Sequence, residues 1–136
     1  MTRRLLTILH CLFCCLLLAG CTMSPPVSTC EQLTAAAKDY SRQLRWRETD
    51  QALKLVIPAP DGPRPAWNDA LKQIEVVDCS VKEIICTPDT DLAKTFLSLS
   101  YLRAGSATLQ NRDLLVEWRK MPTTGWSILS APPPFR

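Results

Sequence analysis

The spacing of hydrophobic residues divides the chain into a helical half and an extended half. From residue 29 to about residue 47, apolar side chains recur three and four positions apart, which predicts an amphipathic helix. Ser28 or Thr29 is suited to cap its N-terminus, because a hydroxyl oxygen there can accept a backbone N–H of the first turn. The apolar face consists of Leu33, Ala36, Ala37, Tyr40 and Leu44.

Two shorter helices are predicted before the pattern changes. The first begins near Thr49 and Asp50, either of which is suited to cap it. The stretch 58–65 holds four prolines and one glycine, which predicts a loop. The segment 66–74, AWNDALKQI, is then predicted to form a second short helix or one turn of it.

The second half of the chain alternates hydrophobic and polar residues, which is typical of β-strands. Short turns, TPDTD and PTTG among them, separate the strands and favour an antiparallel meander. Helices followed by strands predict the α+β class, with the N-terminal helices packed on a curved antiparallel sheet. The predicted strands cover residues 73–86, 92–105, 111–121 and 125–131.

The predicted strand 92–105 carries apolar side chains on both faces. Leu97, Leu99 and Tyr101 form the better candidate for the core face, while Phe96 and Leu102 lie on the opposite face. A strand with apolar groups on both sides predicts that neither face of the sheet is simply solvated. In the last two strands, Trp118 and Trp126 are expected in the core or at its edge.

Three segments carry a resemblance to a known family. They are Tyr40 with LRWRETDQA, the strand VVDCSV, and Trp118 with TGWSIL. Together they resemble the nuclear transport factor 2-like fold, a cone of helices over a curved sheet. The resemblance implies one such domain over residues 30–136. It says little about function, because similar folds host isomerases, dehydratases and pure binding modules.

The start of the chain has the layout of a signal peptide. A basic head, Met1-Thr2-Arg3-Arg4, precedes an uncharged run over residues 5–20. This run is shorter than the roughly 20 apolar residues that cross a bilayer as a helix. It ends in Leu18-Ala19-Gly20-Cys21, which resembles the lipobox of bacterial lipoproteins. The alternative is a plain signal peptide or an uncleaved anchor, in which Cys21 is incidental.

The lipobox resemblance implies a specific maturation. A signal peptide over residues 1–20 is cleaved between Gly20 and Cys21. Cys21 receives a diacylglycerol on its thiol and an acyl chain, such as palmitate, on its new amino terminus. Residues 21–29 then form a lipidated tether. Thr22 stands where aspartate retains similar lipoproteins at the inner membrane, which favours the outer membrane, facing the periplasm.

Cleavage changes the chemistry that the chain can perform. It removes His10, the only histidine, and so excludes Ser-His-Asp, Cys-His and the usual zinc mechanisms. It also removes Arg3 and Arg4, which leaves 14 basic against 13 acidic residues. This near balance is not typical of nucleic-acid binding. We expect no metal and no cofactor.

Three cysteines remain beyond the anchor, so at most one disulfide forms within a monomer. Cys79 and Cys86 lie about 23 Å apart along a straight strand, which is beyond disulfide reach. We expect free and mostly buried thiols. A bridge from Cys30 is the alternative.

Few side chains are candidates for chemistry. Asp78 and Glu83 are expected on a solvated strand face, with a role as inward-facing carboxylates as the alternative. The arginines of RQLRWR are expected on a solvated helix face, with a cation–π or lipid-headgroup contact as the alternative. Four aromatic residues are expected to pack in or over the core, with a place in a ligand pocket or at its rim as the alternative. They are Tyr40, Trp46, Trp67 and Tyr101.

The sequence therefore predicts a membrane-anchored lipoprotein of the cell envelope. Its folded part is expected to be a non-catalytic binding or assembly module, with a second copy of the chain or another envelope protein as its partner. The alternative is a small nuclear transport factor 2-like enzyme that uses a buried carboxylate.

Overall fold

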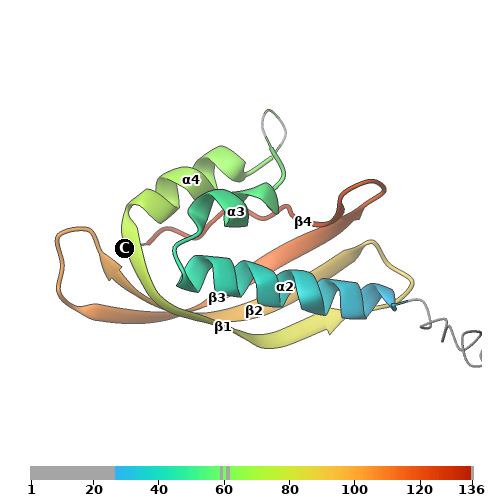
Figure 1. Cartoon of the computed structure of the whole chain (residues 1–136), viewed down its shortest axis with the longest axis horizontal. Coiled ribbons are helices and arrows are strands. Elements are labelled where there is room, and N and C mark those ends of the chain that lie inside the picture. Colours follow the sequence, from blue (N-terminus) through green and yellow to red (C-terminus); the bar gives the residue numbers. More distant parts are fainter. Residues whose placement is uncertain (1–26, 59, 61, 136) are drawn as a thin grey trace, which may run out of the picture.

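The computed structural model describes residues 27–58, 60 and 62–135 (Figure 1). The predicted signal peptide, the cleavage site at Gly20 and Cys21 lie outside the described residues. The folded part has two layers, in which helices cover one face of a curved antiparallel sheet. The prediction of an α+β fold is confirmed.

The helical elements lie where the hydrophobic spacing placed them. They are α2 (Thr29–Arg45), α3 (Thr49–Lys54) and α4 (Arg64–Lys72). Ser28 caps α2 through a reciprocal capping box: its Oγ accepts the Glu31 N–H at 3.2 Å, and its own N–H donates to Glu31 Oε2 at 2.8 Å. The N-cap of α3 is Glu48, one residue before the predicted caps.

The sheet is a meander with the strand order β1-β2-β3-β4, and it does not close into a barrel. After α3, residues 55–57 run along β4, where the Ile57 N–H donates to Ile128 O at 2.9 Å. This contact covers part of the exposed edge of β4. The strands are β1 (Ile74–Cys86), β2 (Leu92–Arg103), β3 (Leu109–Met121) and β4 (Gly125–Ile128).

Strand β1 contains two irregularities that simple alternation does not predict. Its pairing with β2 shifts between Val76 and Asp78, and again between Val81 and Glu83. Each shift is a β-bulge that inserts one residue and reverses which side of the sheet the next residues face. The residues of β1 that belong to the core or pack against it are therefore Ile74, Val76, Cys79, Val81, Ile84 and Cys86.

The core lies between the helices and the inner face of the sheet. Leu97, Leu99 and Tyr101 are buried there, as predicted. Trp118 and Trp126, on β3 and β4, are also buried, so their predicted core position is confirmed. Trp118 pairs with Ile128 across the last two strands.

The expectation of free thiols is wrong for two of the three cysteines. Cys30 and Cys86 form a disulfide, with their Cα atoms 5.8 Å apart, and Cys79 is free and buried. The two bulges explain why Cys86 is available, because the second restores the side-chain phase that the first reverses. Cys86 thus faces the first turn of α2, where Cys30 lies.

Candidate functional site

Three aromatic side chains fill the space between α2, α4 and the sheet. The ring of Tyr40 packs edge-to-face on Trp67 and on Trp118, with centroid distances of 6.2 Å and 6.0 Å. All three residues are almost fully buried. Trp67 Nε1 donates to Ser130 O at 2.8 Å, and Trp118 Nε1 donates to Thr95 Oγ1 at 2.9 Å. Tyr40 and Trp67 therefore hold the two layers together.

Two groups stay neutral at physiological pH: the hydroxyl of Tyr40, within this cluster, and the thiol of Cys79 near it. Burial raises the pKa of the Cys79 thiol to about 12, and the carboxylate of Asp78 adds to the rise. Burial likewise raises the pKa of the Tyr40 hydroxyl far above its ordinary value, with a further contribution from Cys79. Only a thiolate is an effective nucleophile, so this environment suppresses the reactivity of Cys79.

The two candidate carboxylates lie at the surface. The side chain of Asp78 is half-exposed, and its Oδ1 lies 3.2 Å from Arg45 Nε. Glu83 is exposed and pairs with Phe96 across β1 and β2. Among the described residues, the polar residues buried as a whole are Ser41, Thr95 and Ser127. Asp78 Oδ1 is itself buried and has no hydrogen-bond partner in the described part of the chain, although the side chain as a whole is half-exposed.

The four aromatic candidates do not converge on one pocket. Tyr40 and Trp67 are in the core, while Tyr101 packs on Phe135 and donates its hydroxyl to Gln110 Oε1 at 3.0 Å. Trp46 is 68% exposed, so the expectation that it covers the core is wrong. The reason is helical phase: Trp46 lies about 200° around α2 from Leu44, the last buried residue of that helix.

The arginines around Trp46 are each paired with a carboxylate. Arg42 contacts Asp39 within α2, Arg45 contacts Asp78, and Arg47 contacts Glu75. All of these side chains are well exposed to solvent. The predicted solvated helix face is confirmed, and the pairing leaves little net charge there for an anionic ligand.

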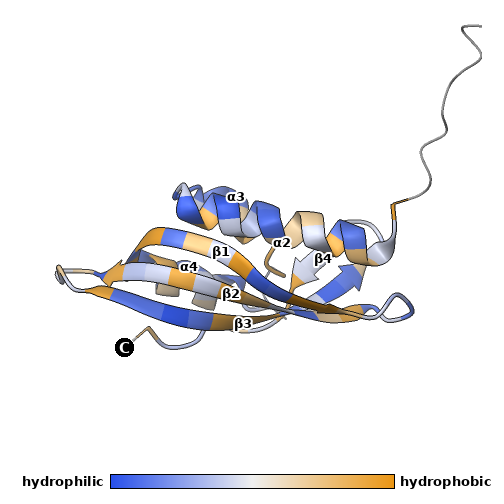
Figure 2. Cartoon of the chain, turned by 90° about the horizontal axis from the view of Figure 1, so that it is seen from below, coloured by the Kyte–Doolittle hydropathy of each residue, from blue (hydrophilic) through white to orange (hydrophobic). Residues whose placement is uncertain are grey.

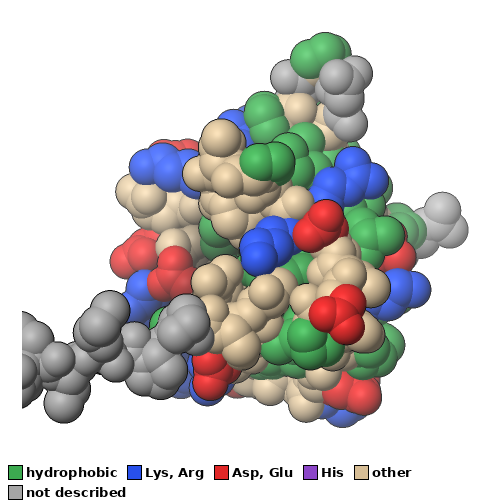
Figure 3. Space-filling model, turned by 90° about the vertical axis from the view of Figure 1, so that its right-hand side faces the viewer, with side chains coloured by type: hydrophobic (Ala, Val, Ile, Leu, Met, Phe, Trp, Pro, Cys, Tyr) green, Lys and Arg blue, Asp and Glu red, His purple; other side chains and the backbone are tan. Residues whose placement is uncertain are grey.

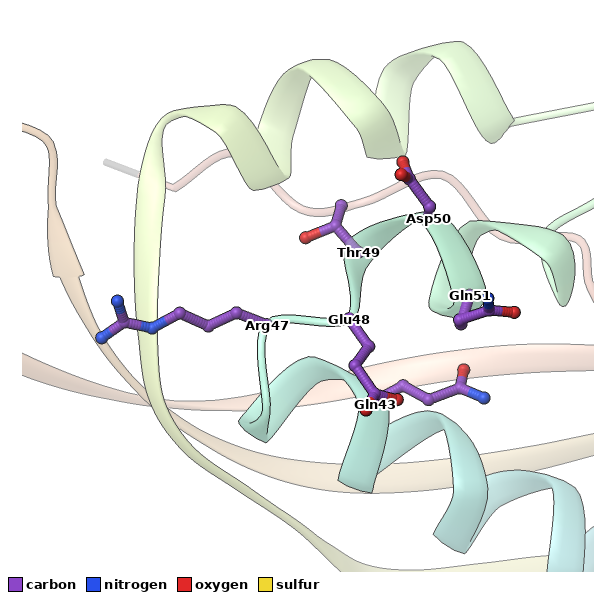
Figure 4. Close-up of a pocket in the computed structure, with 6 residues that line it drawn as sticks. All are labelled: Gln43, Arg47, Glu48, Thr49, Asp50 and Gln51. Atoms are coloured by element: carbon purple, nitrogen blue, oxygen red, sulfur yellow. The ribbon is translucent and has the colours of Figure 1, made fainter.

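An open pocket of about 650 Å³ lies at the junction of α2 and α3. Its side chains diverge: Arg47 extends toward β1, whereas Asp50 points toward α4 (Figure 4). Gln43 donates to Asp39 Oδ2 at 2.8 Å, and its own Oε1 is buried without a hydrogen-bond partner among the described residues. The remaining lining residues are Glu48, Thr49 and Gln51.

A second hollow, of about 290 Å³, lies at the end of the sheet near the β1–β2 turn. We call it the sheet-end groove. Ile85 and Leu92, both about half-exposed, contribute to its lining together with Leu129. An ion pair joins Lys94 Nζ to Glu117 Oε1 at 3.5 Å inside the lining, and Arg119 completes the charged part.

The outer face of the sheet, which the helices leave uncovered, continues from this groove. Hydrophobic and hydrophilic residues are mixed along its strands (Figure 2). Next to the groove, Phe96 pairs with the exposed Leu115, and at the far end Leu102 pairs with the exposed Leu109. The alternation along residues 92–105 predicts the apolar groups on this face. It does not predict the groove, because the loops and bulges that shape the groove leave no periodic signal.

Comparisons with protein-family models, with curated proteins and with solved structures give no match to this chain. Within the described ranges, no helix is both long and apolar enough to span a membrane. The same residues contain no group of three or more side chains placed to hold a metal ion. The outer face of the sheet, with its groove, is the candidate binding surface.

Proposed function

We propose that this chain is a lipoprotein of the cell envelope, anchored through Cys21, whose folded domain is a non-catalytic binding or assembly module. The anchor is proposed from Leu18-Ala19-Gly20-Cys21 and from the segments that precede it, a basic head followed by an uncharged run. The structural observation that carries the proposal is the disulfide between Cys30 and Cys86. Disulfides persist in oxidising compartments such as the periplasm, so this bond supports export.

The proposed membrane is the outer membrane, with the domain facing the periplasm. Thr22 follows the cysteine, where similar lipoproteins retained at the inner membrane carry aspartate. The resemblance to the nuclear transport factor 2-like family is likewise a proposal, supported by the two-layer arrangement of helices on an open, curved sheet.

The binding role is proposed for the outer face of the sheet. The space on the helical side is occupied by Tyr40, Trp67 and Trp118. The outer face, in contrast, exposes Leu109 and Leu115 in the isolated chain. Its partner is another envelope protein or a second copy of this chain. Pairing through the free edge of β1 is disfavoured, since bulges interrupt the regular row of hydrogen-bonding groups that an added strand needs.

Metabolic labelling with palmitate tests the anchor. We expect label in the wild-type protein and none in Cys21→Ser. The Cys30–Cys86 disulfide serves as the control, because both forms should carry it if they are exported. Equal labelling of the two would contradict the proposal. Sucrose-gradient fractionation tests the membrane, since a peak with the inner membrane would overturn the outer-membrane assignment.

Light scattering on residues 22–136 tests self-association. A dimer would support a second copy as the partner. A monomer at concentrations of tens of micromolar would leave another envelope protein as the proposed partner. Covalent cross-linking in intact cells followed by mass spectrometry would identify that protein.

A further inference from the structure

We propose that the sheet-end groove rests against the lipid leaflet that holds the anchor at Cys21. This inference depends on the anchoring proposed above and adds an orientation of the domain on the membrane.

The disulfide brings the groove to the end of the domain where the tether enters. Cys86 is bonded to Cys30 in the first turn of α2. Its neighbours on either side, Ile85 and Thr87, both line the groove. Figure 3 looks onto this end of the molecule, where hydrophobic side chains are interspersed with charges of both signs.

Two hydrogen bonds from the last hairpin fix the same end. Trp126 Nε1 donates to Thr29 O at 3.1 Å, and Lys120 Nζ donates to Thr29 Oγ1 at 3.2 Å. The first residue of α2 is thereby held to β3 and β4, as Cys30 is held to β1. The tether consequently enters at a fixed point relative to the groove.

The tether is short. Residues 22–28 separate Cys21 from the first residue of α2, so they span at most about 25 Å when fully extended. As a flexible chain they would span about 15 Å on average. A linker of this length holds the groove near the leaflet at an effective concentration in the millimolar range. Trp46, at the other end of α2, lies about 25 Å farther along the helix.

The lining of the groove suits a lipid interface. Leu92 is 57% exposed and Ile85 is 49% exposed, which places aliphatic groups where acyl chains begin. Arg119 beside them carries a long side chain that can extend its charge toward phosphate groups, whereas Lys94 is paired with Glu117. Asp89 and Asp91 occupy the adjacent turn, so the contact rests on the apolar groups and not on net positive charge.

A second copy of the chain fits this groove less well. A standard protein interface buries about 800 Å² on each partner. Even a fully buried aromatic side chain supplies only about 150–250 Å², so a few half-exposed aliphatic side chains fall short. A small apolar patch suffices for a leaflet, because the anchor already holds the domain there.

Photocross-linking in membranes isolated from expressing cells tests this inference. A benzophenone amino acid replaces Leu92 in the groove, or Leu109 as a matched control. Leu109 is 51% exposed at the opposite end of the sheet, so the two positions differ in place and not in exposure. Palmitate labelling and the disulfide on non-reducing gels are monitored in the same samples, as markers of anchoring and folding.

We expect phospholipid adducts at position 92 to exceed those at position 109 by about tenfold, because the short tether holds the groove, and not the opposite end of the sheet, near the leaflet. The adducts should persist at high ionic strength, because the contact is apolar. Three results at position 92 would overturn the inference when Cys21 is labelled: an adduct with a second copy of the chain, an adduct with another envelope protein, or no adduct. None of them would contradict the proposed lipid anchor. Absence of label on Cys21 would instead overturn the proposed function together with the inference.

Discussion

Cys30 and Cys86 join the first turn of α2 to the last residue of β1, across 56 residues of sequence. The bond connects the two layers of the domain at one end. The loop that the bond closes contains nearly all of α2 together with α3, α4 and β1, which is about half of the described residues. The disulfide thus has a structural role as well as fixing where the tether enters.

Removing this disulfide should reduce stability substantially. For a closed loop of about 56 residues, the loss of chain entropy in the unfolded state corresponds to about 4 kcal/mol, and measured values are commonly 2–4 kcal/mol. The double variant Cys30→Ser, Cys86→Ser should therefore unfold at a lower urea concentration. Dithiothreitol should shift the wild type to the same extent and leave the double variant unchanged. Identical midpoints with and without reductant in the wild type would show that the bond contributes nothing.

The two tryptophans Trp118 and Trp46 should respond very differently to truncation. Trp118 is fully buried and donates to Thr95 Oγ1, so Trp118→Ala should cost about 3–5 kcal/mol. Trp46 is 68% exposed, and Trp46→Ala should change the free energy of unfolding by no more than about 0.5 kcal/mol. Urea denaturation followed by circular dichroism measures both variants. A large effect at Trp46 would mean that its ring packs on the domain.

Strands in which hydrophobic and polar residues alternate regularly could be predicted from the sequence. The β-bulges that interrupt this alternation could not. Strand β2 was predicted over 92–105 and found at Leu92–Arg103, because its side chains alternate without a break. In β1 the same rule fails after Val76, since a bulge turns Cys79 to the inner face. The residues of β1 alone do not predict such a bulge, because the bulge depends on how β1 pairs with β2.

The candidate site was harder to predict for a related reason. Tyr40 and Trp46 carry the same kind of side chain, and both were candidates for a pocket. Tyr40 is buried and Trp46 is exposed because they lie at different angles around α2. In addition, the helix ends beside Trp46, where Arg47 adopts a positive φ of 59° and the chain turns toward α3. The disulfide also required a three-dimensional contact between a helix start and a strand end, which spacing along the chain does not encode.

Two tyrosines offer a matched test of buried hydrogen bonding. The hydroxyl of Tyr40 is buried with no partner among the described residues, whereas that of Tyr101 donates to Gln110. Tyr40→Phe should stabilise the domain by about 1 kcal/mol, because it removes an unpaired buried polar group. Tyr101→Phe should instead destabilise it by about 1 kcal/mol, through loss of a hydrogen bond. A destabilised Tyr40→Phe would indicate that this hydroxyl has a partner, such as a buried water.

The environment of Cys79 predicts how stability depends on pH in the alkaline range. Its pKa is raised from an ordinary value near 9 to about 12, chiefly by burial, so the folded state holds the thiol proton more tightly than the unfolded state does. Below pH 9 both states keep the proton and the thiol contributes no pH dependence. Between pH 9 and pH 12 the unfolded chain releases it first, so the free energy of unfolding should fall by at most about 1.4 kcal/mol per pH unit.

The variant Cys79→Ala isolates this contribution. The variant will be less stable at every pH, since it removes a buried sulfur, but its decline between pH 9 and pH 10 should be shallower than that of the wild type. Tyr40 has a raised pKa as well and adds to the loss at higher pH, so the lower part of the range gives the cleaner comparison. Urea titrations at closely spaced pH values measure the slopes. Equal slopes in the two proteins would mean that the Cys79 thiol ionises as readily in the folded domain as in the unfolded chain.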